Sequence, residues 1–123
     1  MTLNTVEYDK LLSGPADYPQ AVPVGAAQDI KRGDLLEADP AKGSAAVFTR
    51  PAGAAVSGMV HCVATDDVQT AAGVTAVLPA YFAGYFNPDV MRFGGASTPA
   101  DNAPALMLSH IFLRAVVDAQ PTA

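Results

Sequence analysis

The chain has 123 residues, of which half are hydrophobic and 15% are charged, and its formal net charge is −5. This length supports one modest hydrophobic core, and the high apolar content excludes a disordered chain. The acidic balance excludes a basic surface for nucleic acid and electrostatic attachment to an anionic membrane.

The sequence shows neither a membrane-spanning run nor a secretory signal pattern. No segment reaches the about 18 consecutive apolar residues of a transmembrane helix, and Glu7 and Asp9 stand where a signal peptide would place positive charge and an apolar run. Cys62 is the only cysteine, so an internal disulfide is impossible and a reducing compartment suits the chain. We therefore expect the protein to stay where it is synthesised, or to leave as part of something larger.

Residues 1–25 are predicted to form an extended, flexible N-terminal arm, and residues 26–123 a single β-rich domain. Pro15, Pro19 and Pro23 recur every four residues, and proline disfavours both a regular helix and a central strand. Apolar side chains within the arm indicate that it orders against a partner, although a plain flexible terminus is the alternative. These candidate anchors are Val6, Tyr8, Leu11, Leu12, Tyr18, Val22 and Val24.

From residue 26 onward the pattern is typical of short strands separated by turns. Residues 29–36 alternate around a polar turn at Gly33, where glycine supplies the backbone freedom that a tight turn needs. Pro79 interrupts the longest strand candidate and favours an edge strand or a bulge there. The further strand candidates are residues 45–49, 56–64 and 74–86, with Gly58 and Gly84 as additional turn positions.

The C-terminal part is predicted to hold one short helix followed by a closing strand. Residues 97–101 combine a hydroxyl cap at Thr98, a proline in the first turn and an acid three residues after the cap. Pro104 leaves a second possibility, a helix capped by Asp101 or Asn102. His110 lies where the helix would end, and residues 111–117 are predicted to form a strand. The predicted fold class is therefore mainly β with one short C-terminal helix (α+β).

The residue types and their spacing indicate no enzyme activity, no cofactor and no metal site. His61 and Cys62 are neighbours on a predicted strand, so they point to opposite faces, and a buried cysteine acts as a small hydrophobe. Asp66 and Asp67 lack further ligands at metal-binding spacing and are expected in a turn. The serines show no G-x-S-x-G spacing, and the glycines form no phosphate-binding motif.

Over about residues 28–117 the sequence resembles the head decoration proteins of lambda-type tailed bacteriophages, in three stretches. The first is the turn at residues 30–36. The second and most specific stretch contains G-A-A-V, G-M-V and A-T-D between residues 53 and 66. The third contains G-Y-F and D-V-M between residues 84 and 91. The sequence departs from the family pattern in its lack of tryptophan, its longer arm and an extra polar loop around residues 94–102.

The resemblance implies a viral structural protein with a small β-barrel or β-tulip-like subunit. Such a subunit would form a homotrimer on the outer capsid surface of the virion, bind the major capsid protein through its arm, and stabilise the expanded phage head at threefold positions. It would be synthesised in the host bacterial cytoplasm and contact neither nucleic acid nor membrane. The turn at residues 30–36 also resembles small β-clip domains, so a ligand- or carbohydrate-binding domain is the alternative.

Overall fold

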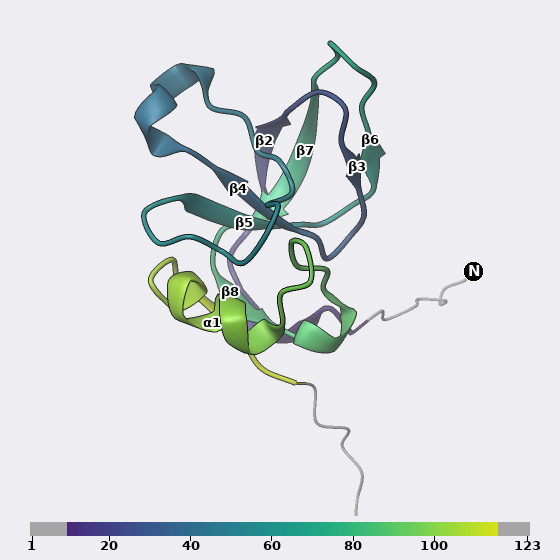
Figure 1. Cartoon of the computed structure of the whole chain (residues 1–123). Coiled ribbons are helices and arrows are strands. Elements are labelled where there is room, and N and C mark those ends of the chain that lie inside the picture. Colours follow the sequence, from purple (N-terminus) through teal and green to yellow (C-terminus); the bar gives the residue numbers. More distant parts are fainter. Residues whose placement is uncertain (1–9, 116–123) are drawn as a thin grey trace, which may run out of the picture.

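The computed structural model describes residues 10–115, and the strands among them form three sheets (Figure 1). The strands are β1 Leu12–Ala16, β2 Gln20–Val24, β3 Asp29–Ile30, β4 Leu35–Ala38, β5 Val60–Ala64, β6 Val68–Gln69, β7 Ala76–Tyr81, β8 Gly84–Phe86 and β9 Ile111–Leu113. The helices are the 3-10 helices η2 Pro40–Ala45 and η3 Pro88–Val90 and the α-helix α1 Pro99–Met107. The sheets have the strand orders β2–β7–β5–β4, β1–β8–β9 and β3–β6.

The prediction of a mainly β fold with one short helix near the C-terminus is confirmed. The expected barrel is not formed, because the described strands divide among three sheets and none of these closes on itself. Two stretches that the sequence predicts as continuous are each divided between two sheets. Residues 29–36 contribute β3 and β4 to different sheets, and residues 74–86 contribute β7 and β8 to different sheets. Of residues 45–49, only Phe48 and Thr49 make isolated bridges.

Two hydrophobic cores lie on opposite faces of β4 and β5. Alternation along these strands sends Leu36 and Cys62 into the first core and Leu35 and Val63 into the second. The first core contains Val22, Val24, Ile30, Leu36, Ala38, Phe48, Cys62, Ala64, Leu78 and Ala80. The second core contains Leu11, Leu35, Val63, Phe86, Met91, Leu106 and Ile111, so it joins the four-stranded sheet to α1, β8 and β9.

The predicted arm over residues 1–25 is wrong for its C-terminal half, which forms β1 and β2. β2 pairs with β7 along its whole length, from Gln20 opposite Ala80 to Val24 opposite Ala76. Leu11, Val22 and Val24 are at most 3% exposed and belong to the cores. Val6 and Tyr8 lie outside the described residues. The domain boundary expected near residue 25 therefore falls inside the folded unit.

The strands tolerate proline because each ring nitrogen points where no ladder bond is needed. The Pro23 carbonyl accepts a hydrogen bond from the Phe48 N–H at 2.8 Å, so Pro23 turns its nitrogen away from β7. Pro79 immediately precedes Ala80, the residue of β7 at which the pairing with β5 ends. The Pro79 carbonyl accepts from the Thr65 N–H at 3.2 Å, so its nitrogen turns away from β2. Pro79 thus occupies an inner strand, contrary to the predicted edge or bulge.

Gly84 opens β8 and does not lie in a turn, which corrects the expectation from the sequence. Its φ is 141°, and a Cβ at this position would lie 2.6 Å from the Ala16 Cα of the neighbouring strand β1. Glycine is therefore needed here for the close approach of two strands as well as for its backbone conformation.

Gly33 and Gly58 provide a matched pair for measuring the effect of crowding on stability. Both lie in turns with a φ of 93°, but a Cβ at Gly33 would lie 2.8 Å from the Val90 carbonyl oxygen, whereas nothing lies within 4 Å of one at Gly58. We expect Gly58→Ala to lower the free energy of unfolding by about 1 kcal/mol through backbone strain alone. Gly33→Ala should cost about 1–3 kcal/mol more because the added methyl overpacks the turn.

Denaturant unfolding of the two variants measures both quantities. Equal losses would show that the backbone around Val90 moves aside at no cost, in contradiction to the expected difference.

Thr98 caps α1, so the first of the two predicted helix starts is confirmed. The Thr98 hydroxyl accepts from the Asp101 N–H at 3.2 Å, and the Asp101 carboxylate accepts from the Thr98 N–H at 2.9 Å. This reciprocal arrangement satisfies two donors that the first helical turn would leave unpaired. The buried Asn102 side chain then accepts from the Ala55 N–H at 2.7 Å, which ties α1 to the loop before β5. The helix ends at Met107, so His110 lies beyond it.

Candidate functional site

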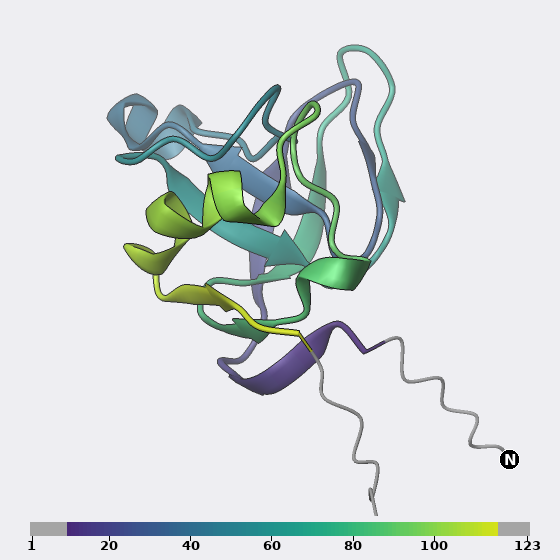
Figure 2. The same ribbon diagram turned by 60° about the horizontal axis from the view of Figure 1, so that its bottom comes forward.

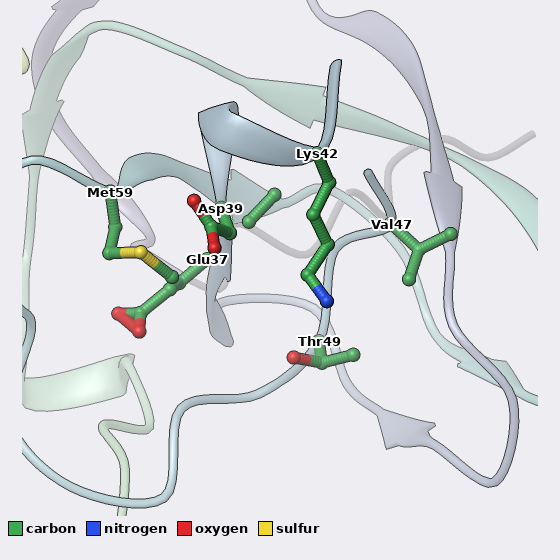
Figure 3. A pocket seen from close by; sticks show the side chains of 7 residues that line it. Glu37, Asp39, Lys42, Val47, Thr49 and Met59 are labelled. Atoms are coloured by element: carbon green, nitrogen blue, oxygen red, sulfur yellow. The ribbon is translucent and has the colours of Figure 1, made fainter. Parts of the chain in front are cut away.

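A pocket of about 260 Å³ opens beside β4 and η2 (Figure 3). It is lined by Glu37, Ala38, Asp39, Lys42, Val47, Thr49 and Met59. Figure 3 shows the Glu37 carboxylate beside Met59 and the Lys42 amine directed toward Thr49. Asp39 already accepts a hydrogen bond from the Ala41 N–H at 2.9 Å as the cap of η2. The pocket is small beside the about 300–1,000 Å³ typical of sites for organic ligands.

Behind Glu37 lies a buried histidine that contacts groups on both sides of its ring. His61 is 1% exposed and lies opposite Glu37 in the register of β4 and β5. Its Nε2 is 3.3 Å from Glu37 Oε1, but the alignment is too poor for a hydrogen bond and both atoms lack another partner. Its Nδ1 is 3.4 Å from the Ser109 hydroxyl oxygen. Burial lowers the pKa of His61, and the Glu37 carboxylate partly opposes this effect.

The order Ser109, His61, Glu37 is that of a hydrolase triad, but the surroundings do not fit acyl transfer. A triad needs free N–H donors aimed at the developing oxyanion. The N–H groups of Ser109 and His110 already donate to the carbonyls of Leu106 and Met107, at 2.9 and 3.1 Å. The lowered pKa also makes His61 a weaker base than a free imidazole. This cluster therefore joins β4 and β5 to the connection after α1, and the two amides beside Ser109 are not available as oxyanion donors.

Cys62 and His61 point away from each other, as the strand alternation predicts. Cys62 is fully buried in the first core, while His61 faces Glu37 and Ser109. Burial raises the pKa of the Cys62 thiol, so the thiolate form that would act as a nucleophile is suppressed.

Asp66 and Asp67 support the bend between β5 and β6. Asp66 accepts from the Asp67 N–H at 3.1 Å, and Asp67 accepts from the Arg32 N–H at 2.8 Å. Within residues 10–115, no three histidine, cysteine, aspartate or glutamate side chains gather at metal-binding distances.

A buried carboxylate that the sequence reasoning missed joins the turn at Gly33 to the segment after η3. Asp34 is fully buried and accepts from the Lys31 N–H at 2.8 Å. Arg92 donates to both Asp34 oxygens, with its Nη2 at 2.6 Å from Oδ2, and Arg50 Nε lies 3.5 Å from the same oxygen. These hydrogen bonds raise the pKa of Arg92. No sequence pattern pairs residues 34 and 92, so only the fold shows this contact.

The predicted capsid-binding residues do not form one surface. Leu11, Val22 and Val24 are buried, and Leu12 is 37% exposed within β1. Tyr18, in the connection between β1 and β2, is 90% exposed and is the most accessible of the described candidates. Val6 and Tyr8 fall in the part of the chain that the structure does not describe.

Comparison with protein-family models, curated proteins and solved structures finds no match to this chain. In the described part of the chain, no helix is long and apolar enough to cross a membrane.

Proposed function

We propose that this chain is a head decoration protein, a homotrimer that binds the outside of an expanded bacteriophage capsid at threefold positions and stabilises it against internal DNA pressure. The observation that supports this proposal is that the three stretches resembling lambda-type decoration proteins meet in one hydrogen-bonded unit. The Gly33 N–H donates to the Ala64 carbonyl at 2.9 Å, and the Ala64 N–H donates to the Asp34 carbonyl at 3.0 Å. The Leu35 N–H donates to the Arg92 carbonyl at 3.1 Å, directly after the third stretch.

The chemistry of the described residues favours binding over catalysis. The amides of Ser109 and His110 are already hydrogen-bonded to carbonyls of the helix, and burial raises the pKa of Cys62. A protein that acts by contact needs accessible surface and a rigid domain to present it.

One face of the sheet offers such a surface. The outward side chains of β2 and β7 are Ala21, Pro23, Val77 and Pro79, all of them exposed and uncharged. The exposed fraction of Val77 is 68%. On β4 and β5 the same side of the sheet is covered by the second core, whereas within the described chain β2 and β7 have no such cover. Exposed apolar patches of this kind mark interaction sites in soluble proteins.

The residues that contact the capsid must differ from the set predicted for the N-terminal arm. Val22 and Val24 cannot bury themselves against a capsid protein, because they already fill the first core. Tyr18 remains available, with 90% of its surface exposed. We therefore assign the capsid-facing role among the described residues to Tyr18.

The proposed mechanism is thermodynamic. A protein that binds the assembled shell and not its dissociated parts stabilises the shell by mass action. A trimer seated where three capsomers meet adds contact area across joints that internal pressure would open. Its effect therefore depends on occupancy and not on turnover.

The test is protection of undecorated, DNA-filled phage heads by the purified protein. Light scattering should first give a trimer mass at micromolar concentration. Genome release on heating should then fall as protein is added and reach a plateau at a fixed ratio of trimer to threefold lattice sites. A monomer, or protection that persists far below site saturation, would contradict the proposal.

The pocket beside Glu37 favours a second candidate, a small ligand- or carbohydrate-binding domain. Charged and hydroxyl groups from Glu37, Lys42 and Thr49 converge there, as polar groups do in ligand sites. Amide chemical shifts of Thr49 and Met59 that respond saturably to a panel of monosaccharides and organic acids would support this function. Decoration by itself predicts no such response.

A further inference from the structure

One buried imidazole connects three parts of the fold. Glu37 on β4 lies opposite His61 on β5, with Glu37 Oε1 at 3.3 Å from His61 Nε2. On the other side of the ring, Nδ1 lies 3.4 Å from the Ser109 hydroxyl. Ser109 stands in the short connection between α1 and β9. The end of the helix is therefore linked to the sheet through His61.

We propose that this Ser109–His61–Glu37 contact is an acid-sensitive latch that holds residues 99–113, here called the cap, against the four-stranded sheet. The cap comprises α1 and β9, and its Leu106 and Ile111 pack against Leu35 and Val63 in the second core. Figure 1 places α1 directly below β5, and Figure 2 shows the helix crossing in front of the same sheet. Opening of the cap would expose His61 to water.

Burial is the reason that the closed cap disfavours a charged imidazole. With the His61 side chain 1% exposed, desolvation lowers its pKa from the ordinary 6.5, and the charge and proximity of Glu37 only partly restore it. The closed cap therefore keeps His61 neutral at pH 7. In an open cap the hydrated ring takes up a proton near its ordinary pKa of 6.5.

The direction of the pH effect follows from this difference. A proton binds the open cap more tightly than the closed cap, so acid shifts the equilibrium toward opening. The latch is at full strength above about pH 6.5 and weakens as the pH falls from there through the lowered pKa of the closed state. Within this window each pH unit favours the open cap by up to about tenfold.

Within residues 10–115, the polar groups that contact this imidazole come from β4 and from the cap. Glu37 approaches from β4, and the Ser109 hydroxyl, which has no charge, approaches from the cap. Asp39 and Lys42 line the pocket that gives water access to Glu37 (Figure 3). His110, next to Ser109, is exposed and has a φ of 64°. A left-handed conformation at a non-glycine residue is strained.

Hydrogen exchange of the full chain tests the latch, because backbone amides report the cap and the distant sheet separately. The Ser109 and His110 amides donate within the cap, to Leu106 and Met107, and the amides of the β2–β7 ladder serve as the reference. After correction for intrinsic exchange, protection of the cap amides should fall by up to about tenfold per pH unit below about pH 6.5, while the reference amides keep theirs.

The two histidines of the chain supply matched variants. His61→Gln should abolish the pH dependence of cap protection, whereas the exposed His110→Gln should preserve it. Glu37→Gln removes the charge that favours protonation, so it should move the transition to lower pH. NMR titration of the imidazole in the unmodified chain adds a readout that needs no variant, and His61 should titrate below the ordinary pKa of 6.5. Cap protection that stays flat between pH 7.5 and 5, that falls together with the reference amides, or that depends on His110 would overturn the proposal.

Discussion

Replacing Arg92 with alanine is expected to lower the free energy of unfolding by about 3 kcal/mol, because it leaves the buried Asp34 carboxylate without its main partner. Asp34 is fully buried, and Arg92 contacts both of its oxygens. The estimate lies at the lower end for broken buried pairs because the Arg92 side chain is 43% exposed and Arg50 remains 3.5 Å from Asp34. Such a loss is a large part of the about 5–15 kcal/mol that stabilises a domain.

A second substitution distinguishes the buried charge from lost packing. Asp34→Asn in the Arg92→Ala background should recover part of the stability, because an amide is cheaper to bury than an unpaired carboxylate. Arg114→Ala is the control, since its described contact is with the Tyr85 ring at 5.8 Å and is worth about 0.5–1 kcal/mol. A double variant less stable than Arg92→Ala would contradict the buried-charge explanation.

The sequence predicts the elements of this fold better than their partners. Thr98 and Asp101 form the predicted helix start because a capping box involves neighbours along the chain. The prediction from proline is wrong because it depends on a contact between residues that are distant in sequence. Whether Pro23 breaks a strand depends on the side to which its nitrogen points, and that is decided by Phe48, which is distant in sequence. Local rules therefore succeed where the interaction is local.

The contrast between local and long-range interactions also explains which parts of the candidate site the sequence predicts. Strand alternation correctly separates His61 from Cys62, since it depends only on position along β5. The partners of His61 are Glu37 and Ser109, which are 24 and 48 residues away, and the strand register and the cap bring them together. With the register of β4 and β5 known, the Glu37–His61 pair could have been predicted. Ser109 could not, because it follows the helix in an irregular connection.

Removing residues 1–24 is expected to unfold the protein, since these residues include two strands of the folded unit. The truncation deletes Leu11, Val22 and Val24, which are at most 3% exposed. Each buried side chain of this size contributes about 1.5–3 kcal/mol, so the three together approach the about 5–15 kcal/mol stability of a whole domain. The loss also removes β2, one of the two strands that pair with β7, and exposes Leu78 of the first core. Circular dichroism should show no cooperative melting transition for a chain that begins at Gly25.

Tyr18→Ala separates the role of residues 10–24 in folding from their proposed role in capsid contact. Tyr18 lies between β1 and β2 and is 90% exposed. We expect this variant to change the free energy of unfolding by less than about 0.5 kcal/mol. If Tyr18 faces the capsid, the same variant should weaken head protection while its melting transition stays unchanged. A truncated chain that still melts cooperatively would show instead that residues 10–24 dock onto a domain that is stable without them. The first core would then rest on its remaining members, among them Ile30, Leu36 and Phe48, without Val22 and Val24.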